Sequence, residues 1–593
     1  MSDQKYVKGG SYILGPSDPK QVFTPEDFSE EHVMIQDTAR KFVDGEVTPV
    51  RDEIDKINYD ISQDLMAKAG ELGLLGIEVE EDFGGIDLDK VTSTIVSEEL
   101  GRAGSFCVTM GAHSGIATLP IVYYGTKEQK EKYLPLLSSG EWVGAYALTE
   151  PGSGSDALAA KTKAVLSDDK KHYVINGSKI FITNGGFAKC FIVFAKIDGE
   201  QFSAFIVERS FEGLSVGEEE KKLGIKGSST TVVNLDNVKV PVENLLGEPG
   251  IGAKIALNIL NIGRFKLGAG ALGAAKDVVD KAVKYTSERE QFGKTINKFG
   301  MIQEKLAKMA TRTFAAESMV YRTVGLIQSL VDTIDKSAED AKRQILKSIE
   351  EYSIECSIVK VYGSEMIDFV SDEGLQCFGG YGFSQEYPME RAYRDSRINR
   401  IFEGTNEINR MLIPGMLLKK GLKGELDVLA AVNAVQKEIT EFPSLAEETG
   451  EILEQEKRLL MNAKKAVVLA SGAGVQRFGA KLQKEQELLG MVADCMIEVY
   501  ALESVILRTL KLVEAKGEEK AARYIDIAKL CAMEAAFTID AKLKEAAASV
   551  LEGDELKIIL SAFKRFMKFV PINAKTLRRN LAAHLIEQGR YNL

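Results

Sequence analysis

Histidine, cysteine and tryptophan are scarce in this chain of 593 residues, which contains four, six and one of them. The six cysteines form no C-x-x-C pair, and the isolated histidines complete no metal-ligand spacing with them. The sequence therefore predicts no metal site, and reduced, buried thiols are the simplest interpretation of the cysteines. No apolar run approaches ~18 residues, so we expect no membrane-spanning helix.

An excess of basic charge is also lacking, since the formal net charge is −12. Nucleic acid is not an expected partner, because phosphate binding requires clustered Lys and Arg. The first residues show neither the apolar core of a signal peptide nor the Arg-rich, acid-poor pattern of a transit peptide. We expect a cytoplasmic location, or the mitochondrial matrix if a transit peptide has been removed.

The pattern of apolar residues divides the chain into helical and β regions. Apolar residues recur at helical spacing, then alternate from about residue 145 to 245, then return to helical spacing. Asn176-Gly177 inside the alternating part predicts a hairpin, and a small antiparallel β domain is expected there. The predicted fold is mainly α with a central β domain, in four units: an N-terminal helical domain over 1–144, the β domain over 145–250, a helical domain over 251–420 and a further helical domain over 421–593.

One motif in the third unit resembles a nucleotide site but is placed wrongly for one. Gly268, Gly270 and Gly273 match the G-x-G-x-x-G dinucleotide pattern. That fingerprint must follow a strand and open a helix, whereas here it lies inside a continuous helical pattern. We therefore predict close helix packing at these glycines and no nicotinamide site.

A single carboxylate in the third unit has the surroundings of a general base. Glu403 follows Ile401 and Phe402 and precedes Gly404. An apolar environment raises the pKa of a carboxyl group, which makes it a useful base near neutral pH. Taken alone, an acid beside Gly and Thr is more often a helix-start residue, because anions favour helix N-termini.

Four motifs in order resemble the acyl-CoA dehydrogenase family. The run around Glu403 (IFEGTNE, residues 401–407, after QCFGGYG at 376–382) is similar to the C-terminal signature of that family. YALTEPGSGSD at 146–156 is similar to its first flavin-binding segment, and FITNGG at 181–186 and REQFG at 289–293 follow in family order. The resemblance covers about residues 30–415 and implies the family fold, with an N-terminal helical domain, a β domain and a helical bundle.

The resemblance implies FAD as cofactor and dehydrogenation of an acyl-CoA thioester to a trans-2-enoyl-CoA in fatty acid β-oxidation. No side chain accepts a hydride, so this chemistry requires a cofactor. Glu403 would remove the α proton, and its backbone N–H would help to hold the thioester carbonyl. Some relatives place the base just before the arginine that resembles Arg264, but Gly263 stands there in this chain.

Further residues take their expected roles from the matching motifs. Phe181 stands where most relatives have tryptophan, and Asn261 where many short- and medium-chain relatives have aspartate. The residues expected to bind FAD are Leu148, Thr149, Gly154, Ser155, Phe181, Ile182, Thr183, Arg289, Phe292, Gln303, Gln376, Gly379, Gly380, Thr405 and Glu407. Those expected to bind substrate are Ser155, Asn261, Arg264 and Gly404.

The resemblance also implies partners. The residues from Arg289 to Gly380 would reach the adenine half of FAD across a subunit interface, which implies a homodimer.

The region after Glu403 resembles the extra C-terminal domain of the very-long-chain subgroup, and small side chains over 113–118 favour a long acyl chain. Electron-transferring flavoprotein would receive the electrons. Residues 425–440 predict an amphipathic helix for which weak peripheral membrane contact is an alternative to core packing.

Two other functions stay open from the sequence. An acyl-CoA oxidase would pass its electrons to oxygen, and sequence hardly separates it from a dehydrogenase because oxygen access depends on cavity shape. A non-enzymatic respiratory-complex assembly factor is the other alternative. The presence of Glu403 together with complete flavin motifs counts against that role.

Overall fold

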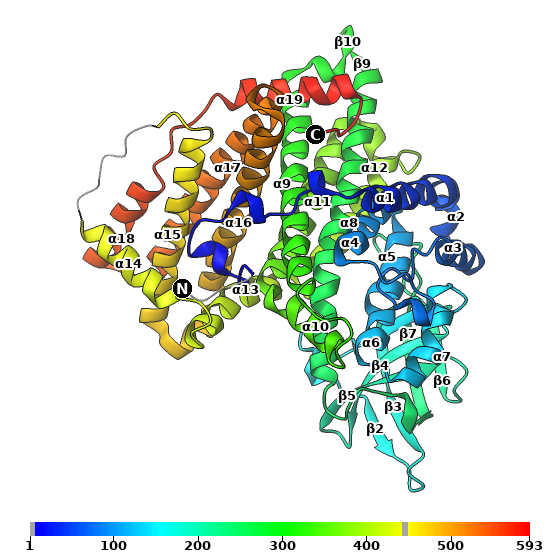
Figure 1. The fold of residues 1–593 in the computed structure, drawn as a ribbon. Coiled ribbons are helices and arrows are strands. Elements are labelled where there is room, and N and C mark those ends of the chain that lie inside the picture. The colour runs from blue at the N-terminus through cyan, green and yellow to red at the C-terminus, as the bar shows by residue number, and fades with distance from the viewer. Residues whose placement is uncertain (1–5, 442–448) are drawn as a thin grey trace.

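The computed structural model describes residues 6–441 and 449–593. Helices form one flank of the β domain, and long helices packed side by side form the centre of the molecule (Figure 1). The N-terminal helices are α1 Glu30–Phe42, α2 Arg51–Ile54, α3 Tyr59–Glu71, α4 Lys90–Gly101, α5 Ser105–Gly111, α6 Thr118–Tyr124 and α7 Lys127–Ser138, with the π-helical turn η7 Ala112–Ala117 between α5 and α6. The sequence predicts an N-terminal helical domain, and its α-helices lie between Glu30 and Ser138.

The stretch over 105–124, which joins α5, η7 and α6, is long and apolar enough to cross a membrane by length and composition. The sequence prediction of no such helix missed it because polar residues such as His113 and Thr118 interrupt the apolar run. Of its most apolar window, 72% is buried inside the protein. Its apolar character is therefore accounted for by packing against the rest of the fold.

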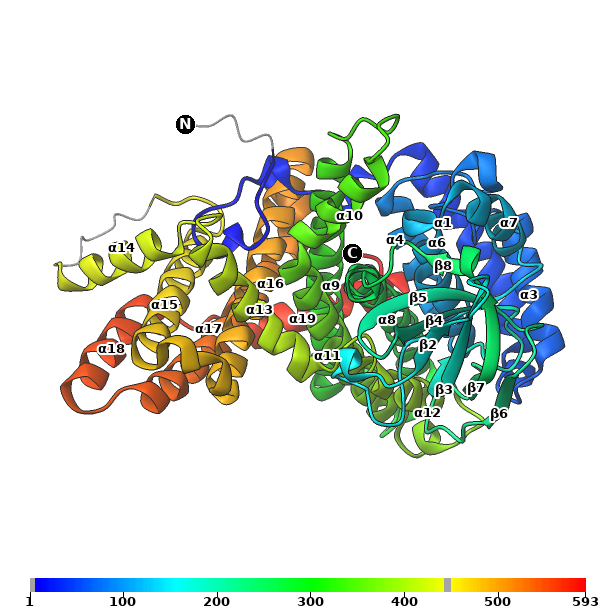
Figure 2. The same cartoon turned by 90° about the horizontal axis from the view of Figure 1, so that it is seen from below.

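The central sheet has eight strands in the order β6-β7-β3-β2-β4-β5-β8, with β1 paired to β4. Most pairs are antiparallel as predicted, whereas β4 pairs in parallel with both β1 and β2. The strands are β1 Gly144–Ala147, β2 Lys163–Leu166, β3 His172–Thr183, β4 Cys190–Ile197, β5 Gln201–Glu208, β6 Leu214–Glu219, β7 Thr230–Pro241 and β8 Leu245–Leu246. The sheet lies beside α8, on the side of the bundle away from the C-terminal helices (Figure 2).

The hairpin predicted at Asn176-Gly177 was wrong. Strand β3 runs straight through these residues, with an irregularity in its pairing to β7 between Ile175 and Gly177. A Cβ at Gly177 would overlap the side chain of Thr162. Glycine is therefore needed here for a close approach between neighbouring strands, which a turn signal in the sequence does not distinguish.

The bundle is built on α8, whose 37 residues run from Gly252 to Glu288. The G-x-G-x-x-G residues lie in its middle, as predicted, and the Cβ that Gly268 lacks would overlap Val359 of α11, while that of Gly273 would overlap the Glu98 carbonyl of α4. These glycines let three helices pack closely. The other elements of this region are β9 Glu290–Gln291, β10 Lys294–Thr295, α9 Gly300–Val331, α10 Ala341–Glu351, α11 Ser353–Phe378, α12 Pro388–Ser396 and α13 Asn406–Leu422.

The remaining helices form the region that we call the appended domain, residues 428–588 (Figure 1). Its helix α16 packs on α9 and α13, and buried ion pairs join the two parts. Arg322 of α9 lies 2.8 Å from Glu503 of α16, and Arg508 of α16 lies 2.6 Å from Glu317 of α9. The helices are α14 Val428–Thr440, α15 Glu454–Phe478, α16 Gln486–Lys516, α17 Glu518–Val550, α18 Gly553–Phe566 and α19 Ala574–Gln588.

Candidate active site

Glu403 lies in the loop between the 3₁₀ turn Arg397–Arg400 and α13, which we call the catalytic loop (residues 401–405). Its backbone is left-handed, with φ of 58°, and Gly404 follows with φ of 81°. Thr405 then caps α13 by accepting a hydrogen bond from the Ile408 N–H at 3.3 Å. A non-glycine residue in this region costs ~1–3 kcal/mol, so the surrounding structure must hold it there.

The carboxylate of Glu403 points at Gly263 of α8. A Cβ at position 263 would overlap Oε2 of Glu403, so only glycine leaves room for this side chain. Oε2 is buried and has no hydrogen-bond partner among the described residues. Some relatives of the resembled family carry an acid at the position of Gly263. In this chain, the Glu403 side chain occupies the space that such an acid would need.

The electrostatic environment suits Glu403 to accept a proton. Burial raises the pKa of Glu403 to about 7, and the nearby charges of Arg264 and Lys360 act in the opposite direction. Arg264 is itself buried and donates to Oδ1 of Asn261 at 2.9 Å. A carboxyl group with a pKa near 7 is partly ionised at neutral pH and still basic enough to remove a proton.

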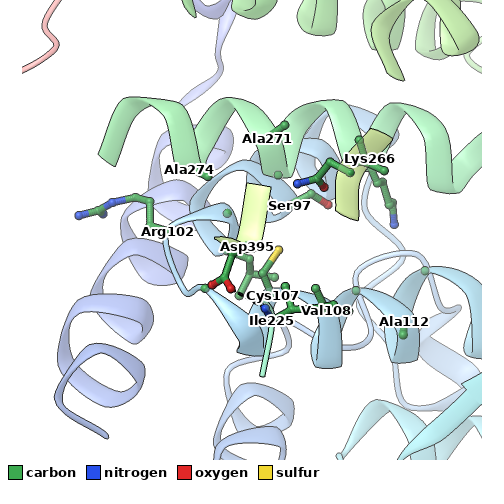
Figure 3. A pocket seen from close by; sticks show the side chains of 18 of the residues that line it. Ser97, Arg102, Cys107, Val108, Ala112, Ile225, Lys266, Ala271, Ala274 and Asp395 are labelled. Atoms are coloured by element: carbon green, nitrogen blue, oxygen red, sulfur yellow. Dashed lines mark hydrogen bonds between the residues drawn. The ribbon is translucent and has the colours of Figure 1, made fainter. Parts of the chain in front are cut away.

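A mainly apolar slot leads from Glu403 between α8 on one side and α4, α5 and η7 on the other (Figure 3). Its lining follows α8 from Gly263 to Lys281, a stretch of ~27 Å at the helical rise of 1.5 Å per residue. Small residues of α5 and η7, namely Gly111, Ala112 and Gly115, line the opposite wall. The slot can therefore hold an extended apolar chain beside the carboxylate.

The loop after β1 is held by a buried ion pair. Nζ of Lys179 lies 2.7 Å from Oε1 of Glu150, and the Thr162 N–H donates to the same carboxylate at 3.0 Å. Leu148 is buried beneath this loop, Thr149 is half-buried, and Gly154 and Ser155 are exposed on it. These four predicted residues therefore lie along one ordered, partly open loop.

The second predicted segment lies beside the first, because the Ile180 N–H donates to the Thr149 carbonyl at 2.9 Å. At the end of β3, Phe181 has φ of 56° and is 60% exposed, Ile182 is buried, and Thr183 lines the slot that leads to Glu403. The structure thus brings the β-domain residues and the carboxylate to one site.

Six of the other predicted cofactor residues form a second cluster at the far end of α8. The Arg289 guanidinium lies 5.4 Å from the Tyr381 ring centre, and Phe292 is 91% exposed in the β9–β10 hairpin. Gly379 and Gly380 have open space where a Cβ would be. Arg289 is ~37 Å along α8 from Arg264 at 1.5 Å per residue, so this cluster lies far from Glu403 of the same chain.

Two residues at the site were missed by the sequence prediction. The Tyr146 hydroxyl in β1 is buried and lacks a hydrogen-bond partner among the described residues, and burial together with the charge of Glu403 raises its pKa. Tyr146 stands inside the first motif and was identifiable from it. Lys360, buried in α11, donates to the Gly404 carbonyl at 2.7 Å. A lone lysine between Val359 and Val361 gave no signal for this role.

The remaining predicted residues lie around α13. Gly404 and Thr405 belong to the catalytic loop, and Glu407 is exposed in the first turn of the helix. The hydrogen bond that Glu407 receives from its own N–H lowers its pKa, as is common for an acid at a helix N-terminus. These residues thus surround Glu403 without contacting the second cluster.

A buried carboxylate lies at the end of an apolar slot, between a β domain and a helical bundle, and this arrangement can hold an apolar ligand next to a proton acceptor. Four protein-family models assign the class further, and the chain belongs to the acyl-CoA dehydrogenase family. The matches are the N-terminal domain over 29–141, the middle domain over 145–238, and two models that are both described as the acyl-CoA dehydrogenase C-terminal domain, over 250–417 and 462–565.

Relatives match over different shares of the chain. A "Probable acyl-CoA dehydrogenase" of Bacillus subtilis is 50% identical over 589 residues, 99% of this chain and 98% of that one. The mitochondrial very long-chain specific acyl-CoA dehydrogenase of Rattus norvegicus is 43% identical over 64% of this chain and 56% of its own. The crystal structure of an acyl-CoA dehydrogenase from Bacillus anthracis complexed with FAD superposes with a TM-score of 0.97 at 50% identity, covering 99% of this chain and 100% of that one.

Proposed function

We propose that this chain catalyses the FAD-dependent α,β-dehydrogenation of acyl-CoA thioesters to trans-2-enoyl-CoA in fatty acid β-oxidation. The observation that carries the proposal is the Glu403 carboxylate, which has a free Oε2 atom and a pKa of about 7 at the end of an apolar slot. Family membership supports the reaction class, and the geometry supports the residue.

The residues present suit a flavin. An exposed Phe181, the open loop at Gly154 and the buried hydroxyl of Tyr146, which has no hydrogen-bond partner among the described residues, surround one face of the site, where an aromatic ring system with polar edges would pack. Short hydroxyls and N–H groups of such loops bind ring and phosphate oxygens. FAD, when bound, supplies the acceptor for the hydride that leaves the β carbon of the substrate.

The protein's own part of the reaction is the removal of the α proton. Glu403 takes this proton on its carboxylate, and the electron pair of the broken C–H bond forms the new C=C bond as the β hydride leaves. Among the described residues, the Glu403 N–H donates to no acceptor, so it is free to donate to the thioester carbonyl oxygen. A donor aimed at that oxygen stabilises the enolate-like charge and acidifies the α carbon.

Long acyl chains are the proposed substrates. The slot continues along α8 for several helical turns beyond Gly263, and its wall at Gly111, Ala112 and Gly115 offers small side chains. A relative with 43% identity is named for very long chains. The side chains on α5 and η7 set the depth of the slot. They would therefore determine the length of the acyl chain that the enzyme accepts.

A homodimer is the proposed assembly. The cluster around Arg289 lies ~37 Å along α8 from Arg264, which is close to Glu403, so we expect that a single flavin does not contact both clusters within one chain. A second copy that presents its Arg289–Gly380 cluster to the Phe181 end would complete the site. Each flavin would then depend on two chains.

The electron acceptor is proposed to be electron-transferring flavoprotein, as the family resemblance implies. The exposed ring of Phe181 offers a surface at the β-domain side of the site for such a partner. Peripheral membrane contact through α14 stays a prediction, with Leu429 of that helix 73% exposed. A cytoplasmic location is consistent with the relatives from Bacillus.

An anaerobic titration of the purified protein with palmitoyl-CoA tests the function. Bleaching of the flavin absorption band would establish bound FAD and the reductive half-reaction together, and a series of chain lengths would then define the preferred substrate. Rapid reoxidation by oxygen after bleaching would identify an acyl-CoA oxidase. A flavin band that no acyl-CoA bleaches would favour a structural or assembly role, and absence of flavin would overturn the proposal.

A further inference from the structure

Lys360 is a buried cation whose ammonium group is held by oxygen atoms of the catalytic loop and of α13. Its Nζ donates to the Gly404 carbonyl at 2.7 Å and to Oδ1 of Asn406 at 2.8 Å. No carboxylate forms an ion pair with it in the part of the chain that the structure describes. A buried ammonium without an ion-pair partner is costly, so the oxygen atoms around it must offset the loss of hydration.

The charged groups that face this ammonium come from four elements. They are Arg264 of α8, Glu365 of α11, Glu403 of the catalytic loop and Glu407 of α13. Burial lowers the pKa of Lys360 to about 8, and the first charge that opposes this change is Glu403. Around Glu403 itself lie Arg264, Lys360 and the Tyr146 hydroxyl.

A chain of hydrogen bonds continues from Lys360 into the appended domain. Nδ2 of Asn406 donates to Oε1 of Glu365 at 2.9 Å. Arg410 donates two hydrogen bonds to the same carboxylate, at 2.8 and 3.0 Å, and its Nε donates to Oδ1 of Asp494 at 2.7 Å. Asp494 lies on α16, so the appended domain contacts the first turns of the helix that follows Glu403.

We propose that Lys360 is a positioning residue for Glu403: it fixes the catalytic loop through the Gly404 carbonyl, favours the ionised carboxylate by its charge, and is itself anchored through Asn406, Glu365 and Arg410 to Asp494 of the appended domain. The inference rests on the proposed role of Glu403 as the base. Two separable effects follow. Loss of the charge raises the pKa of Glu403, whereas loss of the anchor loosens the loop without changing the local charge.

The charge is tested by the pH dependence of kcat/KM for palmitoyl-CoA, measured with an artificial electron acceptor. The acid limb of this profile reports the free enzyme's base. In Lys360→Met, the limb moves to higher pH by about one pH unit, because an opposite charge nearby has been removed. At pH values below the limb, kcat/KM of Lys360→Met is therefore about tenfold lower than that of the unchanged protein. At pH values above the limb, the two values are similar. Lys360→Arg keeps the charge and keeps the limb in place.

Lys420 supplies a control, since it is also buried and also donates to two carbonyls, of Gly9 and Glu351, at 3.0 and 2.9 Å, but it differs from Lys360 in forming an ion pair with the Glu351 carboxylate at 2.9 Å. Lys420→Met is expected to lower the melting temperature and to leave the acid limb unchanged. An acid limb that does not move in Lys360→Met while flavin content is retained would overturn the role of the charge. If Lys360→Met does not retain flavin, the comparison is made with Lys360→Gln.

The anchor is tested by Asp494→Asn, which weakens the hold on Arg410 at a distance from the carboxylate. We expect kcat to fall several-fold with the acid limb unchanged, and a kcat equal to that of the unchanged protein would overturn the link to the appended domain. Failure of the proposed function is distinguishable, because it would appear as an unbleached flavin in the unchanged protein or as retained turnover in Glu403→Gln.

Discussion

The carboxylate of Glu403 in the catalytic loop lies against Gly263 of α8 and leaves no room for a side chain at position 263. A methyl group on Gly263 would overlap Oε2 of the carboxylate. Some members of the family carry their base at the position that corresponds to 263, directly before Arg264. A base at position 263 of α8 and a base at position 403 of the catalytic loop would therefore occupy the same space. In this chain, the glycine on the helix is the structural requirement for the acid on the loop.

Gly263→Ala is expected to lower kcat by at least ~10²-fold, because a displacement of about 1 Å at the reacting group has that effect. FAD content should be unchanged, since the glycine faces the carboxylate. The measurement is the rate of flavin bleaching by palmitoyl-CoA in a stopped-flow instrument. Gly490→Ala on α16 is the control, since a Cβ there meets open space. A Gly263→Ala enzyme with normal rates would show that Glu403 is placed otherwise.

Glu403→Gln should retain FAD and lose turnover by ~10²–10⁴-fold or more, because an amide of the same shape cannot accept the α proton. Absorbance of the purified variant measures the flavin, and anaerobic mixing with palmitoyl-CoA measures the reaction. Glu487→Gln, an exposed acid in the first turn of α16, should behave as the unchanged protein. Dehydrogenation that survives in Glu403→Gln would assign the base to another residue.

Local motifs indicated residues of the candidate site but not the residues that support them. The sequence alone indicated Glu403 and Thr183, and the structure places both at the slot. The contribution of Lys360 could not be read, because its partner Gly404 is 44 residues away in the chain and only the packing of α11 on α13 brings them together. Long-range contacts of this kind leave no pattern in a single sequence.

The failed hairpin at Asn176-Gly177 has a similar cause. Asn-Gly is a strong local turn signal, but the neighbouring strand β2 and the side chain of Thr162 decide the backbone there. Tertiary packing overrode a local preference. By contrast, the rejection of a nucleotide site at Gly268 rested on a long helical period, and α8 is continuous through it.

Arg289→Ala should weaken FAD retention and dimerisation together, because the proposed site draws one cluster from each chain. Gel filtration with light scattering gives the mass, and the ratio of flavin to protein absorbance gives the occupancy. Arg458→Ala, an exposed arginine of α15, is the control and should change neither quantity. Unchanged flavin content in Arg289→Ala would contradict the shared site.

Ala112→Phe should shorten the acyl chains that the enzyme accepts. Ala112 lines the slot on η7, and a phenyl group there would fill space that the proposed substrate occupies. We expect kcat/KM to fall by ~10-fold or more for palmitoyl-CoA and to change little for butyryl-CoA, since a bulky group in an apolar pocket discriminates by about 1–3 kcal/mol. Ala522→Phe, at an exposed position of α17, should leave the ratio unchanged. An unaltered preference in Ala112→Phe would place the acyl chain elsewhere.

The raised pKa of Glu403 also predicts how stability changes with pH. The pKa is about 7 in the folded protein against an ordinary value of 4.5, so between these values the folded state binds a proton that the unfolded state has released. Stability from this group is therefore full below pH 4.5, falls as pH rises toward 7, and is lost above that, by up to ~3 kcal/mol. Glu403→Gln has no such proton, so its melting temperature should drop less than that of the unchanged protein between pH 5 and pH 7.5. Equal drops in the two proteins would mean that the carboxyl group titrates near its ordinary pKa, and the acid limb of kcat/KM should then lie near pH 4.5 instead of near 7.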